Sequence, residues 1–166
     1  MDRSGAMMAW QFFHTSPPPE LIRYIQDRDL WTRSLPGSDE FTVALQSYPQ
    51  DFAVWDKLTV PQLIEEGRHI HRYYRGRVED AKAKAFRAEI GGYIVPVVNA
   101  SGWLASDVAG ELSEGEPFAA LYYDEGEWRN YSLRSRGDGI DVSEIARRYG
   151  GGGHRNAAGF RIARPA

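Results

Sequence analysis

The sequence predicts an α+β protein in which a helical segment and a long helix precede a small domain with a mixed sheet. Helix caps and apolar spacings of three and four recur up to about residue 85, as is typical of helices. After residue 86 the pattern changes to short runs rich in β-branched and aromatic residues, separated by turns that contain glycine. We therefore expect a helical segment over 1–58, a linker helix over 59–85 and a sheet domain over 86–166.

Four helices are expected in the first 85 residues. Ser4 is a candidate N-cap for a helix over SGAMMAWQFF, and Pro19 fits the first position of a helix over about ELIRYIQDR. A third helix is expected over 39–47, followed by a loop toward Trp55. In the fourth, over 60–85, the charged faces indicate a connecting helix rather than a core helix. Its apolar stripe consists of Leu63, Gly67, Ile70, Tyr74, Val78, Ala81 and Ala85.

The rest of the chain predicts strands with two helices between them. FRAEI and YIVPVVN, separated by a glycine pair, predict a β-hairpin, and Pro96 indicates an edge strand or a bulge. A helix is expected over about 104–112. FAALYY and WRNYSLRS then predict a second pair of strands around DEGE. DVSEIARRY predicts a helix with Asp141 as N-cap and Glu144 at the capping-box position, and GFRI predicts the last strand.

Composition and charge restrict the class of protein. The hydrophobic content of 42% in 166 residues suits a packed globular chain, and the chain contains no cysteine, so disulfides and thiolate metal sites are excluded. We expect no membrane span, no signal peptide and a cytoplasmic location. The net charge is −3, but from Arg129 onward eight arginines face three acidic residues. This local balance of +5 leaves −8 for the rest of the chain and indicates a local anion site on an acidic protein.

The run GGGGHRNAAGF, residues 150–160, is the strongest candidate for that site. Gly150 fits the position just past a helix. Successive N–H groups of Gly151, Gly152 and Gly153 could form an anion-binding concavity, above all if HRNAA begins a helical turn. His154 and Arg155 would lie at its rim, with Arg134 of the preceding strand in reach. The alternative is a hairpin-like connection with a surface histidine.

A family resemblance favours the first interpretation. The segment NYSLRSRGDGIDVSEIARRYGGGGHRNAAGF resembles the C-terminal signature of the DHH phosphoesterase family, within its DHH-associated domain. VPVVNASGWLASDVAGELSEGEPFAALYY, RSGAMMAWQFF, YIQDRDLW and EGRHIHRYY extend the similarity over essentially the whole chain. Members of this family hydrolyse phosphate esters, among them oligonucleotides, cyclic dinucleotides and polyphosphate. The resemblance implies that Gly151, Gly152, Gly153 and His154 bind a substrate phosphate, and that Arg134 pairs with another oxygen.

The resemblance also implies a pair of Mn²⁺ or Mg²⁺ ions, held by an Asp-His-His motif. This chain has four histidines, none of them adjacent, so the motif is missing and the sequence starts inside the family pattern. A single family ligand is expected in YIQDRDLW, with Asp29 as first choice and Asp27 as second. The alternative is that these carboxylates form surface ion pairs with Arg33 and Arg23, four residues away in each case.

Three functions follow as expectations. In the first, the chain is the C-terminal part of a phosphoesterase that acts on short oligonucleotides or similar phosphodiesters. The chain by itself is then expected to hydrolyse little or no substrate. In the second, it is a stand-alone RNA-binding module, because the DHH-associated domain that it resembles also occurs in alanyl-tRNA synthetases, where it contacts tRNA. In the third, a separate N-terminal DHH half or a dimer partner docks on the apolar residues of the first helix, Met7, Met8, Trp10 and Phe13. No membrane partner is expected.

Overall fold

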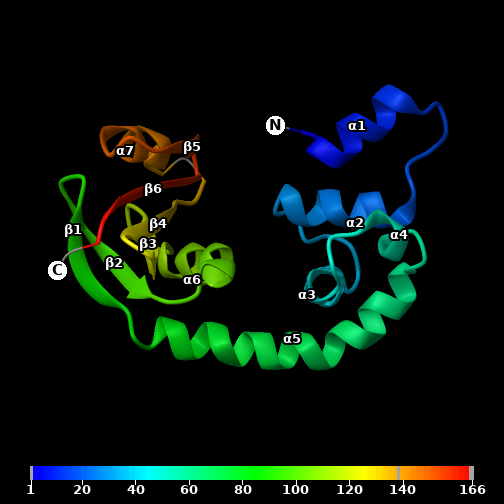
Figure 1. The fold of residues 1–166 in the computed structure, drawn as a ribbon, viewed down its shortest axis with the longest axis horizontal. Helices are drawn as coiled ribbons and strands as arrows, with labels where there is room; N and C mark the ends of the chain where they lie inside the picture. The colour runs from blue at the N-terminus through cyan, green and yellow to red at the C-terminus, as the bar shows by residue number, and fades with distance from the viewer. Residues whose placement is uncertain (1, 138, 165–166) are drawn as a thin grey trace. The chain divides into compact units, whose positions relative to one another are not determined.

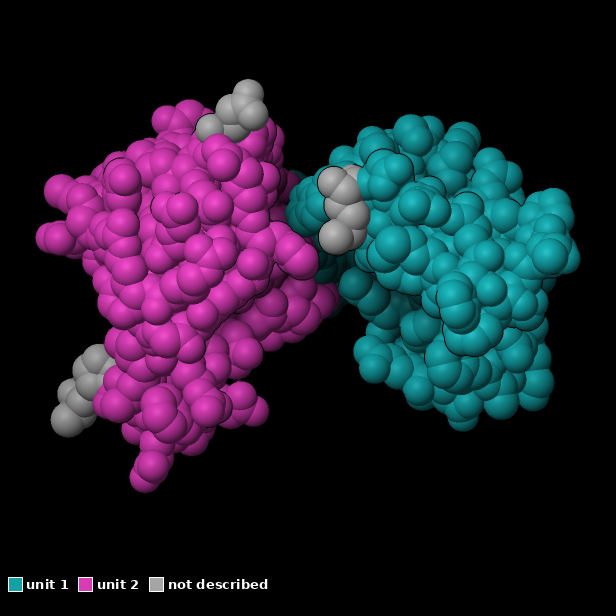
Figure 2. Space-filling model, turned by 90° about the horizontal axis from the view of Figure 1, so that it is seen from above, with its two compact units in different colours: residues 1–75 teal, residues 76–166 magenta. Residues whose placement is uncertain are grey.

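The computed structural model describes residues 2–137 and 139–164. They divide into two compact units, Met1–Arg75 and Gly76–Ala166 (Figure 2). The first unit is helical and the second contains a six-stranded mixed sheet, which confirms the α+β prediction. No helix in the described part of the chain is both long and apolar enough to cross a membrane.

The helices of the first unit begin close to the predicted positions. In α1 (Gly5–Phe13), the Ser4 hydroxyl accepts a hydrogen bond from the Met7 N–H at 3.2 Å, so the predicted N-cap is confirmed. Helix α2 (Glu20–Asp29) starts one residue later than expected, with Pro19 as its N-cap. Helix α3 comprises Ser38–Ser47. A loop was expected before Trp55, but a short helix, α4 (Phe52–Trp55), forms there because Asp51 accepts a hydrogen bond from the Ala53 N–H at 2.8 Å.

Helix α5 (Val60–Lys82) ends three residues before the predicted boundary. It is not merely a connecting helix, because Leu63 and Val78 on its apolar stripe are fully buried. Leu63 belongs to the core of the first unit, together with Tyr24, Phe41, Ala44, Leu45 and Val60. A Cβ atom at Gly67 would lie 2.0 Å from the carbonyl oxygen of Glu40. Glycine at this position therefore allows α5 to contact the backbone of α3.

The sheet of the second unit has the strand order β1-β2-β3-β4-β6-β5 (Figure 1). Among the strand pairs of the described residues, β2 with β3 is parallel and the other four are antiparallel. The predicted glycine turn joins β1 to β2, with φ of 61° at Gly91 and 89° at Gly92, as a type I′ turn requires. The strands are β1 (Phe86–Ile90), β2 (Tyr93–Asn99), β3 (Ala119–Glu125), β4 (Trp128–Arg134), β5 (Gly152–His154) and β6 (Ala157–Ala163).

Pro96 does not mark an edge strand, because β2 has neighbours on both sides. The ladder with β3, however, joins only Val97, Val98 and Asn99 to Ala120, Leu121 and Tyr122. Pro96 precedes that ladder and pairs with Arg87 of β1 alone. A residue without an N–H is tolerated there because the β3 side of the strand is not yet paired.

Two helices cover opposite faces of this sheet. Helix α7 (Val142–Arg148) packs its Ile145 into a core that includes Leu133 of β4. Helix α6 (Ala105–Leu112), which follows a short 3-10 turn η1 (Gly102–Leu104), lies on the other face. Neighbouring residues of a strand point to opposite faces, and Arg134, next to Leu133, donates a hydrogen bond to Ser106 of α6. We call the two surfaces the α6 face and the α7 face.

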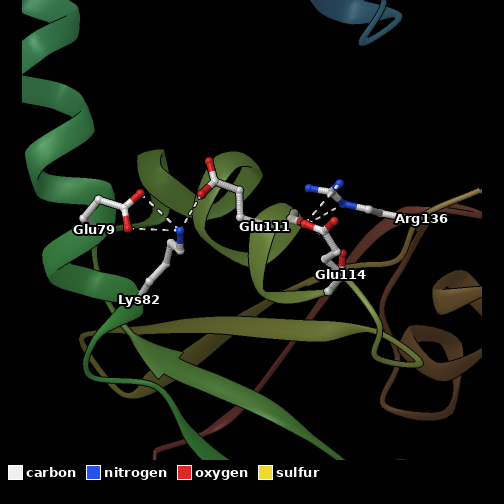
Figure 3. Close-up of polar contacts among 7 residues, drawn as sticks. Glu79, Lys82, Glu111, Glu114 and Arg136 are labelled. Atoms are coloured by element: carbon white, nitrogen blue, oxygen red, sulfur yellow. Dashed lines mark hydrogen bonds and ion pairs between the residues drawn. The ribbon is translucent and has the colours of Figure 1, made fainter.

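Charged side chains fix the position of α6 (Figure 3). The Lys82 ammonium, at the end of α5, contacts Glu111 of α6 at 2.7 Å and Glu79 at 3.1 Å. The Arg136 guanidinium donates a hydrogen bond to the Gly110 carbonyl near the end of α6 at 2.8 Å. Both contacts hold α6 against the rest of the second unit. Helix α6 in turn holds Ser106 beside Arg134.

Candidate functional site

The glycine run forms a β-hairpin. Gly152–His154 is the edge strand β5, Arg155 and Asn156 make the turn, and β6 begins at Ala157. A helical turn over HRNAA, which would have favoured anion binding, does not form, because the register of β6 with β4 keeps Ala157 and its successors extended. The hairpin alternative is the one observed. A helix N-terminus adds nothing to anion binding at this place.

Gly150 and Gly151 complete helix α7. The Gly150 N–H donates to the Arg147 carbonyl at 3.0 Å, and the Gly151 N–H donates to the Ala146 carbonyl at 2.9 Å. With φ of 78° at Gly150, these are the two bonds of a Schellman motif. Both N–H groups are thus used within the fold and cannot also bind a phosphate.

The other two glycines differ from each other. Gly153 has φ of 143°, and a Cβ atom there would lie 2.5 Å from the Ala158 Cα, so the backbone itself requires glycine. A Cβ atom at Gly152 would have no heavy atom of the described residues within 4 Å. Packing therefore gives no reason for glycine at 152. A glycine in such a place is typical of close approach by a ligand or another backbone.

The edge position of β5 leaves main-chain groups available. The pair that flanks a two-residue turn, His154 with Ala157, is hydrogen-bonded in such a hairpin, and the bonding alternates from there. This alternation directs the N–H of Gly153 away from β6, and β5 is the last strand of the sheet. Of the run's amides, that of Gly153 is thus the one directed to the open edge.

The sheet register brings two of the predicted phosphate-binding residues into one row. Arg134 of β4 is aligned with Ala157 of β6, and Ala157 is aligned with His154 of β5. Laterally paired side chains point to the same face, so Arg134 and His154 flank Ala157 on the α6 face. The outer strands of three neighbours lie about 10 Å apart. Two side chains at that separation can reach an anion between them.

Arg134 is held in place by its neighbours. Its guanidinium donates to the Leu133 carbonyl at 2.9 Å and to the Ser106 hydroxyl at 3.1 Å. Sequence reasoning did not find Ser106 as a partner of Arg134, because 28 residues separate them and no local pattern connects them. The exposed His154 side chain lies on the edge strand. The row thus combines one fixed cation with one accessible imidazole.

Arg155 is directed elsewhere. Its guanidinium donates to the Gly139 carbonyl at 3.0 Å, and its own carbonyl accepts from the Val142 N–H at 2.9 Å. It also lies near Asp141, whose pKa is lowered by its hydrogen bond from the Ser143 hydroxyl and, to a smaller extent, by the charge of Arg155. The contribution of Arg155 to phosphate binding stays a prediction, while its observed bonds join the turn to the loop before α7.

Asp27, the second choice for a metal ligand, is buried and fully used by the fold. One carboxylate oxygen accepts from the Thr32 hydroxyl at 2.8 Å and from the Ser34 N–H and hydroxyl at 2.9 and 2.8 Å. The other accepts from the Leu35 N–H at 3.3 Å. Burial raises the pKa of Asp27, but its polar neighbours Ser38, Ser34 and Thr32 outweigh burial and hold that pKa far below its ordinary value. The carboxylate orders the loop that follows α2.

Asp29, the first choice, is exposed at the last position of α2. Partial desolvation raises the pKa of its carboxyl, opposed by the charge of Arg28. The alternative of a surface ion pair does not hold for Asp27, which is buried, and Arg33 contacts Asp39 at 3.5 Å. Trp31 and Arg33 have positive φ of 59° and 45°. Such backbone strain in residues other than glycine is frequent near functional sites.

These residues do not fit a two-metal site by themselves. Among the described residues, no group of three or more histidine, aspartate and glutamate side chains could hold a metal ion. Asp29 is one carboxylate, and Asp27 is committed to its loop. His71 lies 3.8 Å from Glu40, which is the one acidic group of residues 2–137 and 139–164 within ion-pair distance of it. Asp29 as a metal ligand therefore stays a prediction that needs ligands from outside the described residues.

The part of the chain that contains the candidate site is similar to a known domain family. A family model described as the DHHA1 domain matches residues 91–166, which contain the glycine hairpin, Arg134 and Ser106. An uncharacterised protein of Acanthamoeba polyphaga mimivirus is 30% identical over 178 residues, which are 96% of this chain and 41% of that protein. The chain thus spans about two fifths of the length of this curated relative.

Two solved structures are similar at low identity. A pGpG-specific phosphodiesterase from Vibrio cholerae is 11% identical, with a TM-score of 0.49 over 93% of this chain and 66% of that one. The C-Ala domain of the Aquifex aeolicus alanyl-tRNA synthetase is 15% identical, with a TM-score of 0.37 over 48% of this chain and 85% of that one.

Proposed function

We propose that this chain, whose residues 91–166 match the DHHA1 domain model, is the substrate-binding C-terminal part of a metal-dependent phosphoesterase. Its substrates are short oligonucleotides or similar phosphodiesters. The observation that carries the proposal is the open position at Gly152, next to the row of Arg134 and His154 on the α6 face. A phosphate can approach the backbone there without meeting a side chain.

The site binds and orients a phosphodiester. Arg134 presents a planar guanidinium, which is fixed by Ser106 and matches the geometry of two phosphate oxygens. The outward N–H of Gly153 donates to another oxygen from the open edge of β5, and His154 contacts the anion from the other side of Ala157. These contacts hold the substrate in one register while hydrolysis occurs at a neighbouring site.

A pair of Mn²⁺ or Mg²⁺ ions would activate the attacking water. The described residues do not provide such a pair, so its ligands come from a longer form of the protein or from a partner chain, to which Asp29 adds one carboxylate. This division agrees with a chain that spans 41% of its curated relative.

The binding site is tested with 5′-phosphorylated dinucleotide and the full chain. The double variant Arg134→Ala/His154→Ala removes both side-chain contacts, and we expect the dissociation constant to rise by at least about 10-fold, because hydrogen bonds to charged groups contribute roughly 1.5–3 kcal/mol each. Gly152→Val should have a similar effect by occupying the open position, since valine suits a strand. Isothermal titration calorimetry measures both.

Arg148→Ala is the matched control. It removes one exposed arginine from α7, on the other face of the sheet, and should leave affinity unchanged within about 2-fold. Equal binding by wild type, the double variant and Gly152→Val would refute the phosphate site. Folding of each variant is checked by circular dichroism, because only a folded protein reports on the site.

Catalysis gives a separate prediction. The purified chain with Mn²⁺ is expected to hydrolyse a dinucleotide at a rate indistinguishable from a buffer control, because one carboxylate cannot hold two metal ions. Turnover is followed by chromatography of the mononucleotide product. Clear Mn²⁺-dependent turnover that disappears in Asp29→Ala would contradict the proposed division of roles, whatever the binding results.

A further inference from the structure

A second cationic site lies on the α6 face, toward the far end of β4 and β6. Arg161 of β6 is aligned with Asn130 of β4, and Trp128 of β4 with Ala163. The Arg161 guanidinium carbon lies 4.5 Å from the centroid of the Trp128 ring, so both side chains point to the same face. Arg161 is exposed, and 42% of the Trp128 surface is accessible.

Arg161 is fixed by an aromatic ring rather than by an acid. No carboxylate of the described residues lies within ion-pair distance of it. Arg129, on the neighbouring strand β4 but on the α7 face, shows the contrast: it donates two hydrogen bonds to Asp124, of 2.8 and 3.0 Å, and stacks on Tyr122. A guanidinium that stacks on an indole keeps its N–H donors at the ring edge available for a planar acceptor such as phosphate.

This pair and the first row share one continuous surface. Trp128, Asn130 and Arg134 alternate along β4 and therefore point to the same face. Ala157 and Arg161 are four residues apart on β6, which corresponds to about 13 Å. The register pair between them, Ser132 with Gly159, bears no long side chain that would interrupt the surface. The distance exceeds the span of one phosphate group but is within reach of a strand of a few nucleotides.

We propose that Trp128, Asn130 and Arg161 form a second phosphate subsite, which favours an oligonucleotide over a mononucleotide. Arg161 contacts a later phosphate of the strand whose first phosphate lies beside Arg134 and His154. Trp128 orients the guanidinium, and the Asn130 amide lies beside it. Glu125, the last residue of β3 and the partner of Trp128, and Glu127 in the turn after it repel further phosphates and end the track. This inference rests on the proposed function and specifies the length of the substrate that the site prefers.

The test compares AMP with a 5′-phosphorylated tetra-adenylate, both titrated against the full chain. Wild type should bind the tetranucleotide more tightly than AMP. Arg161→Gln should weaken tetranucleotide binding by ~10-fold while changing AMP affinity by less than ~2-fold. Its plot of log affinity against log salt should also become shallower by about 0.7, the value for one phosphate contact on a single strand. Arg161→Lys keeps the charge without the fork and should lose part of the affinity.

The control and the outcomes separate the two proposals. Arg148→Gln, the same charge change on α7, should alter neither affinity nor salt slope. Equal affinity of wild type for AMP and for the tetranucleotide would overturn the subsite. So would an unchanged tetranucleotide affinity in Arg161→Gln, provided that Arg134→Ala/His154→Ala weakens the binding of both ligands. If that double variant also has no effect on either ligand, the proposed function itself fails, and the subsite with it.

Discussion

Gly151→Ala is expected to destabilise the protein by roughly 3–5 kcal/mol, a large part of the total stability of a domain of this size. The new Cβ atom would lie 2.1 Å from the Gly159 carbonyl oxygen and 2.6 Å from the Phe160 Cβ. Neither neighbour can move freely, because Gly159 pairs with Ser132 and Phe160 belongs to the core under α7. Urea unfolding, followed by circular dichroism, measures the loss.

Gly152→Ala is the control for this prediction. It makes the same chemical change one residue later, where the new methyl group has open space, so its effect should stay within about 0.5 kcal/mol. Similar free energies of unfolding for Gly151→Ala and Gly152→Ala would mean that the glycine run is not packed as described. The prediction does not depend on any ligand, so it tests the hairpin independently of the proposed function.

The two glycines show why the run could be predicted only in part. Four consecutive glycines indicate a backbone that must adopt unusual angles or approach something closely, and both occur. Which of them serves the fold depends on β6, because the Gly159 carbonyl lies against Gly151 and Ala158 lies against Gly153. No pattern within the run contains that information. The sequence therefore indicated an unusual backbone in this run, but not that the amide of Gly151 donates to the end of α7.

Local signals predicted most of the elements. The caps at Ser4 and Asp141 and the turn at Gly91-Gly92 each depend on residues near in sequence, and all three are observed. Glu144 lies in the first turn of α7 as expected. The failures depend on distant residues: the place of Pro96 follows from where the ladder with β3 begins, and the extended state of HRNAA follows from pairing with β4.

The candidate site, like the fold, could be predicted only in part from the sequence. Arg134 and His154 were found from the chain and its resemblance, and the register places them in one row. Ser106, which fixes Arg134, was missed because α6 is brought to β4 only by the fold. Asp27 and Asp29 look alike in the sequence. Only the loop after α2, which delivers four donors to Asp27, separates a structural carboxylate from an exposed one.

That difference leads to the second large effect. Asp27→Asn should destabilise the protein by about 2–4 kcal/mol at pH 7, because an amide NH2 would replace one acceptor oxygen among groups that all donate. Its folded pKa is lowered, so Asp27 stabilises the fold above its unfolded pKa of about 4, and this contribution is lost as pH falls toward the folded pKa. The difference between wild type and variant should be constant from pH 7 to about 5 and shrink below about 4.

Asp29→Asn separates this effect from a simple change of charge. Asp29 is exposed and its folded pKa is raised, so its ionised form does not stabilise the fold and the substitution should be neutral or slightly stabilising at pH 7. Thermal unfolding of both variants between pH 3 and pH 7 makes the comparison. Equal losses in the two variants would mean that Asp27 acts through its charge alone. A loss confined to Asp27→Asn would assign Asp27 to the fold and leave Asp29 available for a cation.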